Sequence, residues 1–382
     1  MSGYAILAKD WGADVSGWDR VETPYLEHVR AAGIPVIVEP EPPAPPDGVE
    51  VFVSTAFAGR VAGRPRADLL AELVGLQDAI VVAGAHGKTT TAAMVAFVLD
   101  RLGCDPSFLL GGEVEQLGGN ARAGSGWLVA EGDESDRTVA ALPAKIAVIT
   151  NLDLDHHATF ASEAELEALL HDWIRTQSIP VVIDGSAVEP VGFELALPGE
   201  HNRINAACAL AALEAAGLER AEAEAVLPEF RGVHRRFELR GETDGIRVYD
   251  DYAHHPSELA ATLAAARPLA GDGRVLVLFQ PHLYSRTLHL AHELGATLAA
   301  ADFVCVTDVY AAREEPLESV TGKLVVDRLS EARPGMSIGW TPSVDDGAAL
   351  LRSVMRPGDV VLTIGAGDVD RAVPLLLEDP TS

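Results

Sequence analysis

The sequence predicts an α/β protein with parallel sheets, and three observations lead to this prediction. The apolar run IVVA at residues 80–83 is typical of a buried parallel strand. Similar runs alternate with helix-like segments along most of the chain, which favours βαβ units. A chain of 382 residues exceeds the length of one typical core, so two or three domains are expected.

The first 78 residues are expected to form an N-terminal domain. A helix is predicted over residues 1–12, and a proline-rich connector over 39–48. Strands are predicted at 14–19, 34–39 and 49–57, and helices at 25–33 and 66–76. A βαβ unit normally opens with a strand, whereas this one opens with a helix. We therefore expect either that the recorded start lies inside the reading frame or that the sheet lacks an edge strand.

A central domain is predicted over residues 79–232 and a third domain over 233–382. After the first strand and its helix, the central domain continues through a glycine-rich region at 111–126. Its later strands are predicted at 127–136, 145–157 and 179–184. A helix is predicted at 162–174, and a loop followed by an Ala-rich helix at 198–217. The βα segments of the third domain are predicted at 247–267, 274–287, 288–301, 302–310 and 359–368. The glycine turn that ends the last of these is interpreted as a tight connection, with phosphate binding as the alternative.

The overall charge excludes some classes of partner. The formal net charge is −28 and the pI is about 4.7, whereas nucleic acids and anionic membranes need a basic protein face. The three cysteines are far apart and form no CxxC pair, which indicates no disulfide framework. No stretch approaches 18 uninterrupted apolar residues. A soluble, cytoplasmic protein is the expectation.

A phosphate-binding loop is predicted directly after the strand at 80–83. Its glycines let backbone N–H groups close around an anion, and the following helix N-terminus adds positive potential. Lys88 would contact the β- and γ-phosphates, and the Thr89 hydroxyl would bind Mg²⁺. The spacing is GxxGKT rather than GxxxxGKS/T, and an ordinary strand-to-helix turn is the alternative. The predicted nucleotide-binding residues are Gly84, Ala85, His86, Gly87, Lys88, Thr89 and Thr90.

Carboxylates and histidines follow the next two predicted strands. The carboxyl ends of parallel strands are where ligands bind, and clustered carboxylates need cations or donors beside them. We interpret the first group as a Mg²⁺ region, with a solvated acidic turn as the alternative: Glu131, Asp133, Glu134 and Asp136. The second group is interpreted as linked to metal or phosphate, with a structural role as the alternative: Asp153, Asp155, His156 and His157.

Other polar segments carry recognition chemistry. Asn202 and Asn205 are three residues apart and share a helix face, where their amides could read a purine edge while His201 stacks on it. The segment 234–236 presents arginine at a domain boundary and could bring charge to a γ-phosphate. Two strand-end loops of the third domain, at 250–256 and 280–286, offer carboxylate, phenol, imidazole and guanidinium groups. That set suits a substrate with an amine and a carboxylate.

These motifs, in this order, resemble the Mur ligases, the ATP-dependent enzymes that add amino acids to the peptidoglycan precursor. The similarity covers nearly the whole chain, in AGAHGKTTT, GGNARAGSG, VAEGDESD, ITNLDLDH, PGEHNRINAACA, RRFE, DDYAHHP, FQPHLYSRT, DVYAAREEP and IGAGD. The resemblance implies a Rossmann-like UDP-binding domain, a central P-loop ATPase and a Rossmann-like C-terminal domain, which close together on the substrates. It implies ATP and Mg²⁺ as cofactors, and UDP-N-acetylmuramate and L-alanine as the partners joined through an acyl phosphate.

The resemblance also implies roles for single residues. Catalysis would rest on Lys88, Glu131, His156 and Arg236, and the metal would be held by Thr89, Glu131 and His156. Nucleotide contacts beyond the phosphate loop are implied for His201, Asn202, Asn205 and Asp251. Substrate contacts are implied for Ser135, Tyr252, His254, His282 and Arg286.

Three departures from the family pattern leave alternatives open. The family opens with a strand and GxGGxGMS, of which Met1 and Ser2 resemble the last two residues, so the UDP-diphosphate loop is expected to be missing here. The segment between Asp184 and Pro198 is shorter than in relatives, and Leu283 stands where some relatives have arginine. A murein-peptide ligase that uses a recycled tripeptide and a non-catalytic nucleotide-binding homologue are the alternatives. The sequence does not indicate an oligomeric state.

Overall fold

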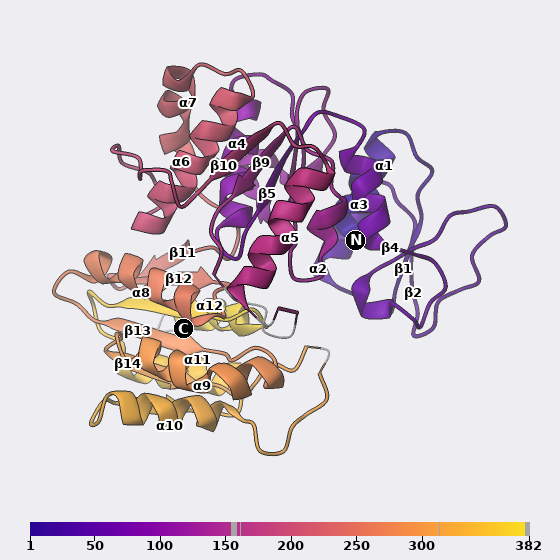
Figure 1. The fold of residues 1–382 in the computed structure, drawn as a ribbon. Helices are drawn as coiled ribbons and strands as arrows, with labels where there is room; N and C mark the ends of the chain where they lie inside the picture. The colour runs from indigo at the N-terminus through magenta and orange to yellow at the C-terminus, as the bar shows by residue number, and fades with distance from the viewer. Residues whose placement is uncertain (154–158, 161, 313, 379–382) are drawn as a thin grey trace. The chain divides into compact units, whose positions relative to one another are not determined.

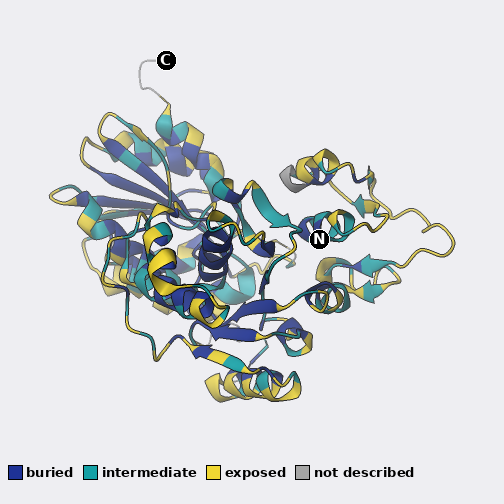
Figure 2. Cartoon of the chain, turned by 90° about the horizontal axis from the view of Figure 1, so that it is seen from above, coloured by how far each residue is buried: buried dark blue, intermediate teal, exposed yellow. Residues whose placement is uncertain are grey.

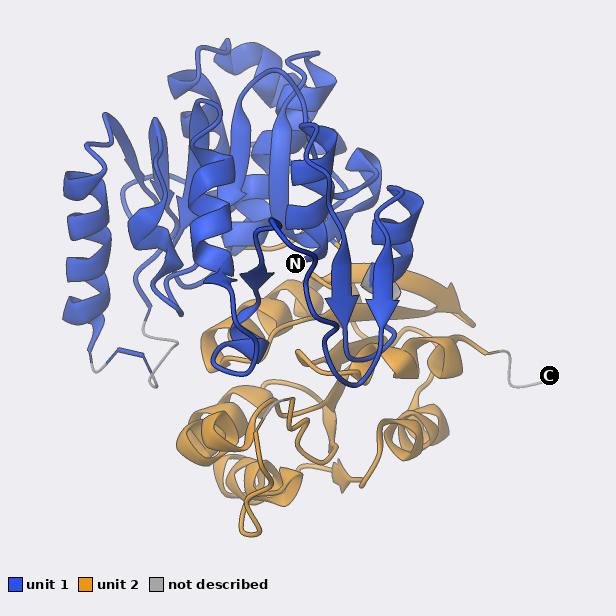
Figure 3. Ribbon diagram, turned by 90° about the vertical axis from the view of Figure 1, so that its right-hand side faces the viewer, with its two compact units in different colours: residues 1–196, 201–233 blue, residues 197–200, 234–382 orange. Residues whose placement is uncertain are grey.

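The computed structural model describes residues 1–153, 159–160, 162–312 and 314–378. It confirms the α/β prediction and divides the chain into two compact units (Figure 3). The first unit contains residues 1–196 and 201–233, and the second contains 197–200 and 234–382. Within the described residues, no helix combines the length and apolar character needed to cross a membrane. The predicted boundary at residue 78 lies inside the first unit and stays a prediction.

The first 78 residues contribute three helices and two small parallel ladders (Figure 1). The helices are α1 (Ser2–Asp10), α2 (Pro24–Ala31) and α3 (Arg66–Val74). The ladders pair β1 (Gly17–Asp19) with β2 (Val36–Val38), and β3 (Phe52–Val53) with β4 (Arg64–Pro65). The strand predicted over 49–57 is therefore much shorter, because β4 pairs with only two of its residues and the chain then turns into a 3₁₀ helix at Thr55–Phe57.

The six-stranded sheet of the first unit has the order β10-β9-β5-β8-β6-β7 and is parallel except for its last pair. Its strands are β5 (Ala79–Ala83), β6 (Ser107–Val114), β7 (Gly119–Arg122), β8 (Leu128–Glu131), β9 (Ile146–Ile149) and β10 (Val181–Asp184). Val82 pairs with Glu131 and Ala83 with Ile149, so the loops after β5, β8 and β9 start side by side. The glycine-rich region at 111–126 forms most of the antiparallel β6–β7 hairpin.

Helices α4 (Lys88–Arg101), α5 (Glu163–Thr176), α6 (Glu200–Ala215) and α7 (Arg220–Val226) accompany this sheet. Every residue of α4 from Thr89 to Leu99 is buried, which explains why its sequence lacks a polar face. By contrast, α5 is amphipathic and buries Leu166, Leu170 and Trp173, which are spaced at helical intervals. In Figure 2 central strands are dark blue, as the buried residues of β5 and β9 are, whereas edge strands and surface helices carry intermediate or exposed residues.

The second unit is built on a six-stranded sheet with the order β11-β12-β16-β13-β14-β15, parallel except for β11. Its strands are β11 (Glu238–Thr243), β12 (Ile246–Asp251), β13 (Val275–Phe279), β14 (Phe303–Val306), β15 (Ile338–Trp340) and β16 (Val360–Ile364). Its helices are α8 (Pro256–Ala270), α9 (Tyr284–Leu298), α10 (Gly322–Ala332), α11 (Val344–Val354) and α12 (Ala372–Leu377). Two apolar cores fill the unit, and each takes side chains from β12, β13, β14 and β16. Because successive side chains along a strand point to opposite faces, these cores lie on the two faces of the sheet.

The β6–β7 hairpin generates a stability prediction at Gly124. A methyl group added there would lie 2.2 Å from the backbone oxygen of Asp105, whereas one added at Gly192 would meet no atom within 4 Å. We expect Gly124→Ala to lower the free energy of unfolding by about 2 kcal/mol, because backbone must move to relieve the overlap. Gly192→Ala is the matched control and should leave the urea midpoint nearly unchanged. Equal midpoints for the two variants would contradict this packing.

Candidate active site

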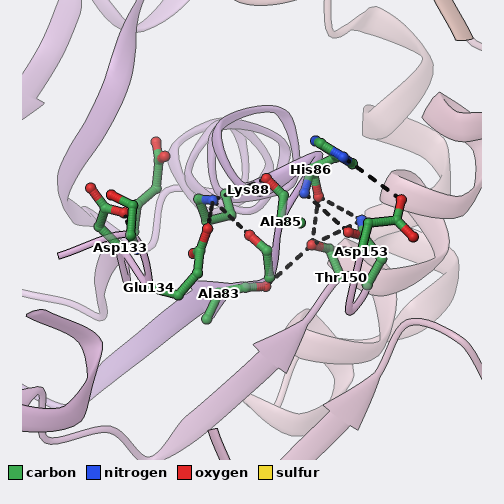
Figure 4. A network of polar contacts seen from close by, with 12 residues as sticks. Ala83, Ala85, His86, Lys88, Asp133, Glu134, Thr150 and Asp153 are labelled. Carbon is green, nitrogen blue, oxygen red and sulfur yellow. Dashed lines mark hydrogen bonds and ion pairs between the residues drawn. The ribbon is translucent and has the colours of Figure 1, made fainter. Parts of the chain in front are cut away.

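The loop between β5 and α4 holds the Lys88 ammonium group in a ring of oxygens. Lys88 Nζ donates to the backbone oxygens of Gly84 at 2.6 Å and Ala85 at 3.1 Å, and to Glu134 Oε1 at 3.0 Å (Figure 4). The side chains of Lys88 and Glu134 are 16% and 1% exposed. The loop therefore places one cation directly at the N-terminus of a buried helix, where backbone N–H groups favour an anion.

Two residues of the loop after β9 brace this phosphate loop, and sequence reasoning did not assign them this role. Thr150 Oγ1 donates to the backbone oxygens of His86 at 2.6 Å and Ala83 at 3.2 Å. The Asn151 side chain accepts from His86 N at 3.1 Å and donates to His86 O at 2.8 Å. The sequence feature that could have identified Thr150 and Asn151 is their place, as two polar residues directly after an apolar strand that neighbours β5.

Helix α6 supports the same loop. Gly87 adopts φ +80°, and an added Cβ there would lie 2.4 Å from Asn205 Oδ1, so the backbone conformation and the asparagine both require glycine. Asn205 and Asn202 are buried, and the Asn205 amide donates to Asn202 Oδ1 at 3.4 Å. Burial lowers the pKa of the neighbouring His201, which favours its neutral form. The structure thus brings the two asparagines to the phosphate loop, while their contact with adenine stays a prediction.

Thr89 and Glu131 form a second polar contact beside the lysine. The Thr89 hydroxyl donates to Glu131 Oε2 at 2.8 Å, and the backbone N–H of Gly111 donates to Glu131 Oε1. A hydroxyl and a carboxylate are hard oxygen ligands, and Mg²⁺ is usually bound through one or two carboxylates plus phosphate oxygens and water. These two side chains therefore fit Mg²⁺ chemically. His156, the third predicted ligand, lies outside the described residues.

The four carboxylates after β8 do not share one set of contacts, and their interpretation as a Mg²⁺ region stays a prediction. Asp133 and Asp136 pair with Arg66 at 3.5 Å and 2.6 Å, whereas Glu134 pairs with Lys88. Within the described ranges, no three acidic, histidine or cysteine side chains converge as a metal site. Asp133 and Asp136 share one guanidinium, whereas Glu134 and Glu131 each have other partners. The predicted substrate residue Ser135 lies between them, and its backbone N–H donates to Asp133 Oδ1 at 2.9 Å.

In the second unit, the two consecutive arginines have different surroundings. Arg235 donates to Asp250 at 2.8 Å and to the backbone oxygens of Gly367 and Gly365 at 2.8 Å and 2.7 Å. It therefore ties the glycine turn after β16 to the end of β12. The Arg236 side chain is 32% exposed. Its Cζ lies 5.2 Å from the centre of the Tyr252 ring, and its Nη1 lies 3.8 Å from Glu258 Oε1. Arg236 remains the residue predicted to meet the γ-phosphate.

Loops after β12, β13 and β14 bring a row of rings together. The His282 ring stacks on Tyr310 with centroids 5.9 Å apart and meets the His254 ring edge-on at 5.8 Å. His254 in turn lies 5.7 Å from Tyr252, and Arg286 Nη1 is 3.2 Å from His282 Nδ1. The four predicted substrate residues of this unit thus lie in one cluster. Tyr310 lies in the motif DVYAAREEP. The sequence predicts no role for it, because its contact with His282 joins different loops.

The residue before α9 also has an unusual backbone conformation. Leu283 adopts φ +69° and ψ 134° at the start of α9, a conformation that is uncommon outside glycine. Its N–H donates to the backbone oxygen of Tyr310 at 2.9 Å, which helps to hold the loop in place. Ser285 is fixed by Glu314, which accepts from its N–H at 2.9 Å. The strained turn is therefore held by the loop that carries Tyr310.

The chain is similar in sequence to known proteins. A family model described as "Mur ligase, glutamate ligase domain" matches residues 235–367. The UDP-N-acetylmuramate–L-alanine ligase of Kineococcus radiotolerans is 38% identical, over 99% of this chain and 93% of the relative. The enzyme of the same name from Rubrobacter xylanophilus is 37% identical, over 99% and 97%.

Solved structures have the same fold. The UDP-N-acetylmuramate-alanine ligase of Thermotoga maritima has a TM-score of 0.80 and 26% identity, over 98% of this chain and 95% of that one. A murein peptide ligase from Psychrobacter arcticus has a TM-score of 0.66 and 22% identity, over 99% and 97%, which shows a shared fold.

Asp251 generates a pH prediction for the second unit. Its carboxylate is buried, accepts from Ala253 N at 2.7 Å and from Thr262 Oγ1 at 3.1 Å, and burial raises its pKa from 3.8 to about 6 despite the charge of Arg236. Between pH 4 and 6 the folded chain therefore holds a proton that the unfolded chain has lost. Stability should fall as pH rises through this window, by roughly 3 kcal/mol in total from this group.

Asp251→Asn removes the titrating group while keeping a hydrogen-bonding side chain of the same shape. Relative to wild type, this variant should gain stability as pH rises from 4 to 6, as measured by urea midpoints at each pH. Asp272→Asn, at an exposed aspartate of the same unit, is the control and should follow the wild-type curve. Parallel curves for all three proteins would show that Asp251 does not titrate in this range.

Proposed function

Because the chain belongs to the Mur ligase family, we propose that it is an ATP-dependent ligase that joins L-alanine to UDP-N-acetylmuramate in peptidoglycan precursor synthesis. The proposal is supported by relatives of that name that are similar over 99% of this chain. The observation that carries it is a pair of contacts, Lys88 with Glu134 and Thr89 with Glu131, beside the ends of neighbouring parallel strands. We also propose a cytoplasmic location, where ATP is available.

The proposed reaction has two steps. The muramoyl carboxylate attacks the γ-phosphorus of ATP, giving an acyl phosphate and ADP. The alanine amine then attacks the acyl carbon, losing a proton, and phosphate leaves. Lys88 and the N-terminus of α4 neutralise charge on the transferring phosphoryl group. Thr89 and Glu131 would hold Mg²⁺, which supplies further neutralisation of the phosphate oxygens when bound.

The ring cluster of the second unit suits the amino-acid substrate. Arg286 provides a guanidinium group for a carboxylate, while His254, His282 and Tyr252 surround it with polar rings. With Leu283 in place of an arginine, Arg286 carries the carboxylate contact in this proposal. We further propose that residues 1–78, 79–232 and 233–382 act as the sugar-nucleotide, ATP and amino-acid domains.

A lysine variant tests the phosphate loop. Lys88→Ala should reduce ADP release with both substrates present by at least about 100-fold, because it removes a charge aimed at the transferring phosphoryl group. It should also lower stability by about 3 kcal/mol, because it removes the ammonium partner of the buried Glu134.

The two effects can be separated within the same chain. Adding Glu134→Gln to Lys88→Ala should restore stability without restoring turnover. Lys145→Ala, at a lysine 58% exposed, is the surface control and should keep both. If the double variant regains ADP release along with its stability, Lys88 has only a structural role.

A substrate assay tests the identity of the amino donor. Phosphate and ADP release should require ATP, UDP-N-acetylmuramate and L-alanine together, and the product should contain one new amide bond. Turnover with the recycled murein tripeptide but not with L-alanine would replace this proposal by the peptide-ligase alternative. Absence of turnover with either donor, from a chain that binds ATP, would instead favour a non-catalytic homologue.

A further inference from the structure

Arg66, the first residue of α3, joins three distant segments of the first unit. Its Nη2 lies 2.6 Å from Asp136 Oδ2 and 3.5 Å from Asp133 Oδ2, both in the loop after β8. Its Nη1 donates to the Tyr4 hydroxyl of α1 at 3.3 Å, and its Nε donates to the Thr55 hydroxyl at 3.2 Å. The guanidinium is thus held by the N-terminal segments on one side and by the loop after β8 on the other.

The two aspartates that contact Arg66 also shape their own loop. Asp133 Oδ1 accepts from Ser135 N at 2.9 Å, and Asp136 Oδ1 accepts from Thr138 N at 3.1 Å. Burial opposes the ionisation of Asp136, but the hydrogen bonds from Thr138 and Arg66 lower its pKa overall. Asp136 therefore stays charged near neutral pH. Each of the two carboxylates links the loop backbone to the guanidinium.

Glu134 lies between these two aspartates and faces the opposite way. Its side chain is buried and accepts from Lys88 Nζ at 3.0 Å, as Figure 4 shows beside Asp133. A buried carboxylate has few alternative positions, so the backbone of this turn determines where Glu134 Oε1 lies. Without Arg66, Asp133 and Asp136 would repel each other and Glu134 across a short turn.

We propose that Arg66 is a positioning residue for the ATP site, which fixes the turn 133–136 and through Glu134 sets the place of the Lys88 ammonium. The contacts with Tyr4 and Thr55 connect this positioning to the N-terminal segments. An ordered N-terminal region then strengthens ATP binding, although none of its residues needs to touch the nucleotide. This proposal rests on the proposed function, because it presumes that Lys88 binds the phosphates of ATP.

The test compares two arginines of similar position. Arg66→Met keeps an unbranched, largely apolar side chain and removes the charge. Arg64→Met is the control, because Arg64 is two residues away and pairs with Glu50, Asp68 and Glu72 instead. ATP affinity is measured by titration calorimetry with Mg·ATP at a temperature where each variant is folded. Arg66→Met should weaken binding by about tenfold, and Arg64→Met by less than about twofold.

A double-mutant cycle separates positioning from general stability. In a Glu134→Gln background, Arg66→Met should weaken ATP binding by less than about twofold, since the path to Lys88 is already broken. An equal loss in both backgrounds would overturn the proposal. Asp136→Asn, which keeps the oxygen that binds Thr138, gives a second variant should Arg66→Met not fold, and it should weaken ATP binding about threefold. Unchanged affinity in Asp136→Asn would also overturn the proposal.

Titration of the wild-type chain with Mg·ATP distinguishes failure of the proposed function from failure of the positioning role. If the wild-type chain binds no ATP, the proposed function fails before Arg66 is tested. If the wild type binds ATP and turns over, but Arg66→Met binds ATP equally well, only the positioning role fails. Partial recovery of affinity in Arg66→Lys would further support the role, because lysine restores the charge without the forked geometry.

Discussion

The nearly buried ion pair between Lys88 and Glu134 is the interaction on which the candidate ATP site depends. Removing two opposite charges from water is costly, and the cost is offset only when the remaining donors and acceptors are satisfied. Here the ammonium also binds the Gly84 and Ala85 carbonyl oxygens, so the loop conformation and the ion pair support each other. Any change to the loop, to α4 or to the turn after β8 therefore alters the place of the lysine.

The strongly negative charge of the chain makes this local arrangement necessary. With a formal net charge of −28, the protein as a whole repels a nucleotide. Attraction must come from short-range groups: the lysine, backbone N–H groups and the helix N-terminus. Most carboxylates near the loop are occupied by partners, with Glu134 on Lys88 and Asp136 on Arg66. Pairing these acids inside the fold leaves less negative charge to oppose phosphate.

The ring cluster in the second unit depends on the arrangement of strands in its sheet rather than on a buried ion pair. Its members come from loops after three strands of one parallel sheet, whose carboxyl ends lie at the same edge. Tyr310 holds His282 by stacking and Leu283 by a backbone hydrogen bond, so one loop sets the shape of another. The buried Asp251 carboxylate ties the cluster to the core, because it accepts from Ala253 N in the loop before α8 and from Thr262 Oγ1 in α8.

The sequence by itself determined what depends on near neighbours along the chain. Apolar runs and helical spacing predicted most strands and most helices, although not β6, β7 or β11. GxxGKTT predicted the phosphate-binding segment at 84–91, because strand, turn and helix N-terminus are local. Tertiary structure decided the partners. Glu134, and not its neighbours, pairs with Lys88, and Arg66 holds the turn after β8. Asn205 requires glycine at position 87. The residues in these three contacts are 46 to 118 positions apart in the sequence. No spacing rule encodes such contacts, since they arise only when parallel strands set distant loops side by side and burial selects which charges must pair.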